Sequence, residues 1–151
     1  DQLRFDFNVS VLDAVFTDFQ SDNPLYSGIE LVDLSGNKLR QSPDLSWFLR
    51  GEYEVPMQSG GALTFGAEAS FKDDQFFTEF NDPITSQDSY TIYNINVKYV
   101  APGEQFTVNL WGKNIGDEYV RSAGYMSSLG RSVANTALPP STWGVTLGYD
   151  F

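Results

Sequence analysis

The last eleven residues, Ser141 to Phe151, read STWGVTLGYDF and alternate strictly between large apolar side chains and small or polar ones. The large side chains are those of Trp143, Val145, Leu147, Tyr149 and Phe151. Because successive side chains of a β-strand point to opposite faces, this period of two predicts a strand with one apolar and one polar face. The stretch holds no Lys or Glu, and its apolar face is rich in aromatic residues. Such a face opposite small polar residues is typical of an outer-membrane barrel strand.

Five further stretches alternate in the same way. They are Leu3–Phe19, whose pattern loosens after Leu12, then Leu45–Val55, Leu63–Lys72, Tyr93–Tyr99 and Phe106–Trp111. About ten residues at roughly 3.3 Å each and a tilt near 45° cross a hydrocarbon band of about 25 Å. The sequence therefore predicts an all-β fold of about six antiparallel transmembrane β-barrel strands.

The predicted connections differ in length in a regular order. Segments 56–61 and 101–104 are short, with 101–104 the tighter turn, whereas 20–42, 74–87 and 114–140 are longer loops. Barrels of the outer membrane pair short periplasmic turns with longer extracellular loops. We expect the three longer segments on the extracellular side, with a short hairpin within 29–39.

Charged residues follow the polar parity of the predicted strands. Those on it are Arg4, Asp6, Arg50, Glu52, Glu54, Glu68, Lys72, Lys98 and Asp150, whereas the apolar parity carries only Asp13. A soluble β-sandwich also alternates, so this segregation alone leaves that fold open. Trp and Tyr near the strand ends of the apolar parity favour lipid on that side.

The composition excludes several classes of function. The chain has 151 residues, no Cys and no His, which removes most zinc sites and the usual Ser-His and Cys-His nucleophiles. Nine basic against twenty acidic residues, a net charge of −11, argue against nucleic-acid binding. No apolar run reaches the roughly 18 residues that a transmembrane helix needs, and the first residues do not resemble a signal peptide. We expect no enzyme activity and no cofactor.

Three stretches resemble the C-terminal part of TonB-dependent outer-membrane receptors. Asn109 to Tyr119, NLWGKNIGDEY, resembles a strand of that family that exits through an Asn and a Gly-Asp step. Pro139–Pro140 followed by WGVTLGYDF resembles its closing strand with a terminal aromatic residue. Gly36 to Pro56 resembles a loop that enters an alternating strand.

The resemblance implies that residues 1–151 form the last part of a 22-stranded barrel in the bacterial outer membrane. It implies a transporter that imports a scarce nutrient, namely a ferric siderophore, cobalamin or an oligosaccharide, with energy coupled through TonB. The implied partners are outer-membrane lipid and lipopolysaccharide, the rest of the barrel, a plug domain and the TonB complex. The chain would be a fragment, a split subunit or one protomer of an oligomeric barrel, because the smallest membrane barrels have eight strands.

Three groups of candidate site residues follow from this interpretation. Phe151, with Tyr149, resembles the assembly signal of outer-membrane barrels. Possible extracellular substrate contacts are Tyr26, Phe76, Phe77, Phe80, Tyr119, Arg121, Tyr125 and Arg131. The residues expected to face the lumen or plug are Phe48, Arg50, Glu52, Glu68, Lys98 and Trp111.

Simpler structural roles also stay open for the first two groups. The terminal aromatic residues also suit a lipid-facing girdle, and the loop residues also suit loop packing and lipopolysaccharide contact. The acids Asp73, Asp74, Glu79 and Asp82 lack the spacing of a calcium loop, so we expect no metal site. Two further functions stay open, namely a multi-chain barrel that does not transport and a soluble carbohydrate-binding β-sandwich.

Overall fold

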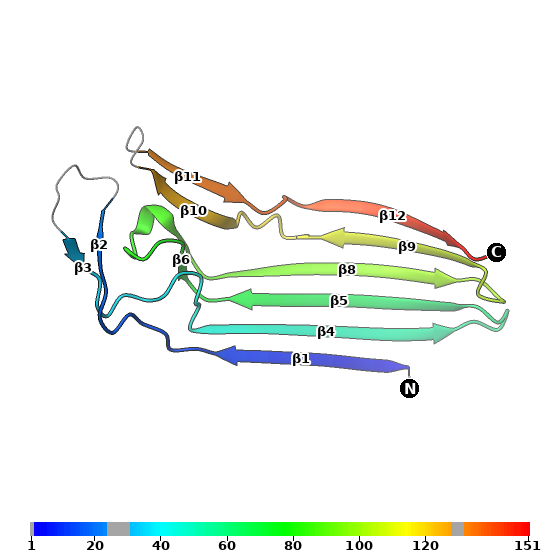
Figure 1. Cartoon of the computed structure of the whole chain (residues 1–151). Coiled ribbons are helices and arrows are strands. Elements are labelled where there is room, and N and C mark those ends of the chain that lie inside the picture. Colours follow the sequence, from blue (N-terminus) through cyan, green and yellow to red (C-terminus); the bar gives the residue numbers. More distant parts are fainter. Residues whose placement is uncertain (1, 24–30, 128–131) are drawn as a thin grey trace.

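The computed structural model describes residues 2–23, 31–127 and 132–151, and its main feature is a six-stranded antiparallel sheet. The strands are β1 (Leu3–Val11), β4 (Leu45–Pro56), β5 (Ala62–Lys72), β8 (Tyr90–Val100), β9 (Phe106–Lys113) and β12 (Thr142–Tyr149). They lie in the order β1-β4-β5-β8-β9-β12, so each strand pairs with the next long strand along the chain (Figure 1). Six antiparallel strands are thus confirmed.

The register keeps the apolar side chains on one face across all six strands. One row runs Leu3, Tyr53, Phe65, Val97, Leu110 and Val145, each opposite the next. A slip of one residue in any pairing would move that strand's apolar set to the other face. The two faces inferred from sequence parity are therefore those of the folded sheet.

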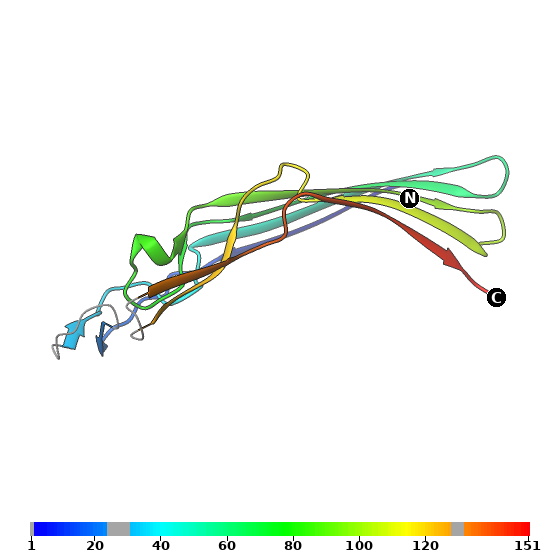
Figure 2. The same cartoon turned by 90° about the horizontal axis from the view of Figure 1, so that it is seen from above.

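The apolar face has no second layer over it in the part of the chain that the structure describes. Seen from above, the sheet is a single twisted layer (Figure 2). Phe5 and Leu147 are each 67% exposed on this face. A soluble β-sandwich buries such side chains between two packed layers, so the alternative of a sandwich does not describe the fold of these residues. Among the described residues, no helix has the length and apolar character required to span a membrane.

Two five-residue turns close one end of the sheet. Residues 57–61 connect β4 to β5, where the Met57 amide donates to the Gly61 carbonyl at 2.7 Å. Residues 101–105 connect β8 to β9, so this turn is not the shorter of the two. Gly60 and Gly103 have φ values of +91° and +79°, a region that L-residues rarely adopt. We call this the turn end; β1 starts and β12 finishes there (Figure 1).

The first strand is shorter than the sequence predicted. β1 stops at Val11, and the Leu12 amide donates to the Asp44 carbonyl at 2.9 Å before the chain leaves the sheet. Leu12 follows Val11 with no polar residue between them, which breaks the period of two. The predicted hairpin also differs, because β2 (Gln20–Asp22) pairs with β3 (Leu31–Asp33).

The loops contain strands that the sequence did not reveal. Segment 114–140, predicted as a loop, holds a hairpin of β10 (Arg121–Ser127) and β11 (Ser132–Ala137). Segment 74–87 holds β6 (Gln75–Phe76), the 3-10 helix η1 (Pro83–Thr85) and β7 (Ser86–Gln87). β6 and β7 have only two residues each, and the sequences of β10 and β11 do not alternate between apolar and polar side chains. These elements gather at the loop end, opposite the turn end (Figure 1).

Candidate functional site

The polar face of the sheet carries every residue that the sequence placed toward the lumen. The register sets Phe48 between Asn8 and Ser70, and Trp111 between Asn96 and Gly144. Lys98 lies between Thr64 and Asn109 on the same face. The charged members Arg50, Glu52 and Glu68 also lie there. The apolar residue Phe48 thus interrupts a polar surface, as its parity predicted.

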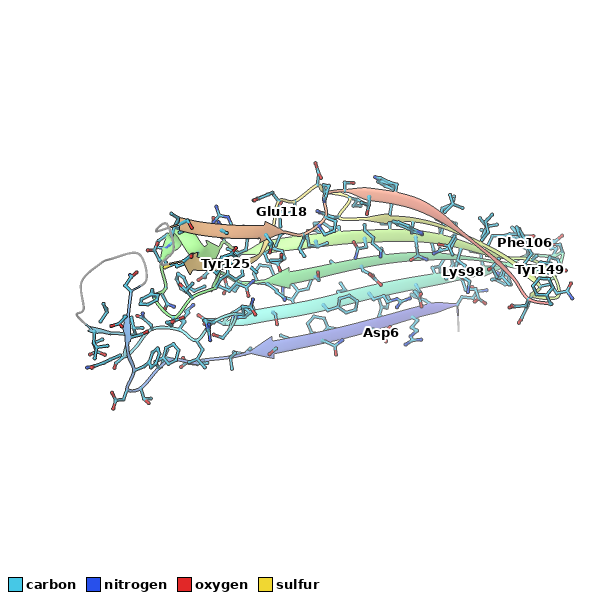
Figure 3. The ribbon with its side chains drawn as sticks, turned by 45° about the horizontal axis from the view of Figure 1, so that its top comes forward. Asp6, Lys98, Phe106, Glu118, Tyr125 and Tyr149 are labelled. Atoms are coloured by element: carbon cyan, nitrogen blue, oxygen red, sulfur yellow. The ribbon has the colours of Figure 1, made fainter. Side chains whose placement is uncertain are left out.

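Arg50 is the centre of a charged cluster on this face. Its guanidinium lies 2.5 Å from Glu52 on its own strand and 3.7 Å from Glu68 on β5. Asp6 on β1, which Figure 3 labels, is paired with Arg50 in the strand register. Arg4 lies 3.2 Å from Asp6, so two cations stand among three carboxylates and balance most of their charge.

Replacing Arg50 by Gln is expected to destabilise the full-length protein by about 1 kcal/mol or less. Its side chain is 41% exposed, so solvent screens both the lost attraction and the new repulsion among the acids. The loss is expected to shrink in 1 M salt, where charges are screened over about 3 Å. Urea unfolding at low and high salt measures it. An Arg50→Gln, Glu52→Gln double variant should recover part of the loss, and a salt-independent effect would contradict the electrostatic account.

A line of amide side chains connects this cluster to the loop end. Asn94 Nδ2 donates to Glu68 Oε2 at 3.3 Å, and Asn94 Oδ1 accepts from the Asn114 backbone amide at 2.9 Å. Asn114 Nδ2 donates to the Glu118 carbonyl at 2.9 Å, and its Oδ1 accepts from the Glu118 amide at the same distance. Asn114 has a φ of +49°, which Asn tolerates better than most residues. The wall and the last loop are therefore held together by hydrogen bonds.

The described parts of the three loop segments 12–44, 73–89 and 114–141 fold together into one assembly, which we call the loop cap. Asn81 joins the first two, because its Oδ1 accepts from the Lys38 amide at 2.7 Å and its Nδ2 donates to the Lys38 carbonyl at 3.0 Å. Arg121 joins the last two, donating from its backbone to Gln87 Oε1 at 2.7 Å and from its guanidinium to the Ser86 carbonyl at 2.9 Å. The buried apolar residues of the described chain, Leu34, Phe77 and Val120, all lie in this cap.

Lys38 forms ionic contacts within the loop cap. Its ammonium donates to Asp44 at 2.8 Å and lies 3.7 Å from Asp74. The hydrogen bond to Asp44, with the nearby negative charge, raises the pKa of Lys38. The lysine therefore stays charged throughout the neutral range and keeps the two loops in contact.

The predicted substrate contacts fall into different environments. Tyr119 is 68% exposed, and Tyr125 is 58% exposed at the loop end (Figure 3). Phe76 and Phe80 are half-buried. Phe77 is 6% exposed, so it supports the packing of the loop cap instead of facing solvent.

Three other predicted substrate contacts are either structural or outside the described residues. Arg121 is half-buried and holds Ser86 and Gln87, so its first role is structural. Tyr26 and Arg131 lie outside the described residues.

The acids weighed for a cation have partners within the protein. Glu79 lies 3.9 Å from Arg40, and Asp82 accepts from the Ile84 amide at 3.0 Å at the start of η1. Asp73 accepts from the Asp74 amide at 2.9 Å. In the described ranges, no three acidic residues gather as a metal site would require.

The terminal aromatic residues lie at the turn end. Tyr149 pairs with Phe106 across β12 and β9, on the apolar face (Figure 3). Phe151 is fully exposed, and its ring meets that of Tyr149 edge-on at 5.1 Å. This position suits both an assembly signal and a girdle residue.

Sequence reasoning missed two kinds of residue. The amides of Asn81, Gln87 and Asn114 organise the loop cap, and only the positive φ of Asn81 and Asn114 relates to a local sequence preference. Lys113 lies one alternation step beyond Trp111 on the polar face, its ammonium 5.3 Å from the centre of the Trp111 ring. Extending the period of β9 by two residues would have found it.

These features define a section of a barrel wall with one polar and one apolar face. The sequence matches no protein-family model and no curated protein. The fold is similar to three solved receptors. The siderophore receptor PiuA from Acinetobacter baumannii is 22% identical over 97% of this chain, with a TM-score of 0.76.

The ferric yersiniabactin uptake receptor FyuA from Yersinia pestis is 20% identical over 81% of the chain, with a TM-score of 0.70. The ferric preacinetobactin receptor BauA from A. baumannii is 18% identical over 78%, with a TM-score of 0.59. The chain spans 19% of PiuA, 19% of FyuA and 16% of BauA. At the level of the fold, the predicted likeness to part of a TonB-dependent receptor barrel is confirmed.

Proposed function

We propose that this chain is part of the wall of a bacterial outer-membrane transporter that binds a scarce nutrient and imports it with TonB-coupled energy. The observation that carries the proposal is the register, which holds one apolar and one polar face through six strands. A transmembrane barrel needs lipid on one side of each strand and a polar lumen on the other. The three similar structures are described as receptors for siderophores or ferric siderophores, which favours that substrate class over cobalamin or an oligosaccharide.

Aromatic side chains on the apolar face support the proposed membrane position. Trp47 and Phe71 stack at 5.7 Å near the loop end, and Phe106 faces Tyr149 at the turn end. Aromatic belts of this kind lie at the two membrane interfaces. The loop cap would then be extracellular and near lipopolysaccharide, and the turn end periplasmic.

The edges of the sheet support further partners. Within the described residues, β1 and β12 each have a neighbouring strand of this sheet on one side alone. Unpaired backbone groups in lipid cost several kcal/mol each, so β1 and β12 are expected to pair with further strands. We further propose that residues 1–151 are the C-terminal part of this barrel, with a plug domain in the lumen and TonB contacted by other segments.

The test is iron uptake by the full-length protein in its own membrane. Deleting its gene is expected to abolish uptake of radiolabelled iron from at least one ferric siderophore, and complementation should restore it. Deleting TonB or dissipating the proton gradient should have the same effect as deleting the gene. Uptake that is unchanged in the deletion strain for every siderophore supplied to the host would contradict the proposal. A discrete multimer of this chain in mild detergent would favour the non-transporting barrel.

A further inference from the structure

An apolar pocket of about 420 Å³ lies on the polar face, at the loop end of β8, β9 and β12. Ile92, Leu138, Pro139 and Pro140 line it with apolar groups. The other lining residues are Trp111, Lys113, Asn94, Asn114 and Thr142. Ligand pockets commonly measure about 300–1,000 Å³ and combine apolar walls with a few polar groups.

Trp111 is fixed in place before any ligand arrives. Its indole lies across Gly144, where an added Cβ would come within 2.3 Å of Trp111 Cζ2. Its Nε1 donates to Thr146 Oγ1 at 3.1 Å. The ammonium of Lys113 lies over its ring, which is a favourable cation–π position. A side chain held from three sides loses little conformational entropy on binding a flat group.

Lys113 supplies a positive charge that no carboxylate neutralises through an ion pair in the described part of the chain. The side chain is exposed, so it is open to a ligand. A cation beside an apolar pocket gives this part of an acidic chain, whose net charge is −11, a local positive charge that favours an anion.

A second hollow of about 490 Å³ adjoins the pocket and shares Asn94, Trp111 and Lys113 with it. Asn96, Asn109 and the ion-paired Arg50 and Glu68 contribute polar groups to it. A ligand with a flat group in the first pocket therefore has room for a larger polar body alongside.

We propose that the pocket formed by Trp111, Lys113, Ile92 and Leu138–Pro140, the Trp111–Lys113 pocket, binds a planar aromatic ring that carries an oxyanion. The ring packs between the indole and the prolines, and the oxyanion pairs with Lys113. This rests on the proposed function, since the ring would belong to a ferric chelate whose body occupies the second hollow. The receptor would thereby prefer chelates with aromatic oxygen donors to purely aliphatic ones.

The test measures binding of three simple chelates to the purified full-length receptor by calorimetry. The probes are ferric catecholate, which is aromatic and anionic, ferric benzohydroxamate, which is aromatic and neutral, and ferric acetohydroxamate, which has no ring. Lys113→Gln is expected to weaken binding of the catecholate chelate about tenfold and to leave benzohydroxamate nearly unchanged. Trp111→Ala should weaken both aromatic chelates about tenfold.

Two further variants keep the test decisive. Thr142→Phe fills the pocket while retaining Trp111 and Lys113, and it should weaken both aromatic chelates. Lys72→Gln removes a lysine on the same face that does not line the pocket, and it should change nothing. Retention of the heat-modifiable folded form checks each variant.

The outcomes separate this inference from the proposed function. Equal affinity for all three chelates would contradict the proposed ligand of the pocket. Chelate affinity that Lys113→Gln and Thr142→Phe leave unchanged would contradict it too. Neither result would contradict the proposed role in iron uptake. Variants that lower the stability of the receptor without lowering its affinity for chelates would also contradict this inference, because another part of the receptor would then fill the pocket. Absence of binding of every chelate by the wild-type receptor would contradict the proposed ligand of the pocket. The proposed transport function would still be supported if the deletion strain loses iron uptake.

Discussion

Leu110→Arg is expected to destabilise the full-length protein in a lipid bilayer by about 2–4 kcal/mol, the cost of an arginine on the lipid face near the midplane of a barrel. Leu110 lies near the centre of β9, opposite Val97 and Val145, and it is 52% exposed. The new guanidinium would face hydrocarbon with no partner on either neighbouring strand. The free energy of unfolding in urea, measured in lipid vesicles, tests this.

Asn109→Arg is the matched control, since it adds the same side chain one residue away on the polar face. It should cost less than about 1 kcal/mol, because lumen positions stay hydrated. Equal costs for the two variants would show that the apolar face does not contact lipid. The proposed transporter would then lose its main support.

Phe77→Ala is expected to loosen the loop cap by about 3 kcal/mol, the lower end of the range for truncating a buried phenylalanine. Phe77 packs beneath β10, where a Cβ added at Gly124 would lie 3.0 Å from its ring. Losing the ring leaves a cavity between the second and third loops. The effect is local, because the sheet is held by its own ladders of hydrogen bonds. Amide hydrogen exchange in β10 should accelerate about 100-fold, as about 1.4 kcal/mol corresponds to tenfold.

Tyr125→Ala provides the comparison within the same hairpin. Its side chain is 58% exposed, so its loss should change exchange in β10 only slightly. Exchange in β5 and β8 should be the same in both variants. Acceleration in β5 or β8 by Phe77→Ala would mean that the loop cap and the sheet unfold together. No acceleration in β10 would mean that Phe77 does not hold the cap.

The sheet was predictable because the direction in which each side chain of a strand points depends only on its position in the local sequence. Alternation with a period of two requires only that each side chain match the environment of its own face. The sides of Phe48 and Trp111 followed from parity before any pairing was known. Short turns with Gly60 and Gly103 then left antiparallel pairing of neighbouring strands as the simplest topology.

The loop cap was not predictable, since its contacts join residues far apart in the sequence. Asn81 binds Lys38 across 43 residues, and Arg121 binds Gln87 across 34. No local pattern specifies such pairs, because each polar group finds its partner only after the sheet has set the spacing of the loops. Phe77 looked like a surface aromatic for the same reason.

The sequence by itself determined the six strands of the main sheet, their two faces and the residues of the polar wall, because these follow from side-chain chemistry repeated every two residues. Only the tertiary structure decided which residues form sites. Trp111 meets Gly144, and Lys113 meets Thr142, only through the register of β9 with β12. Leu138–Pro140 reach the same pocket through the fold of the last loop. A pocket is a property of distances between chain segments, and those distances are set by packing and register, not by local preference.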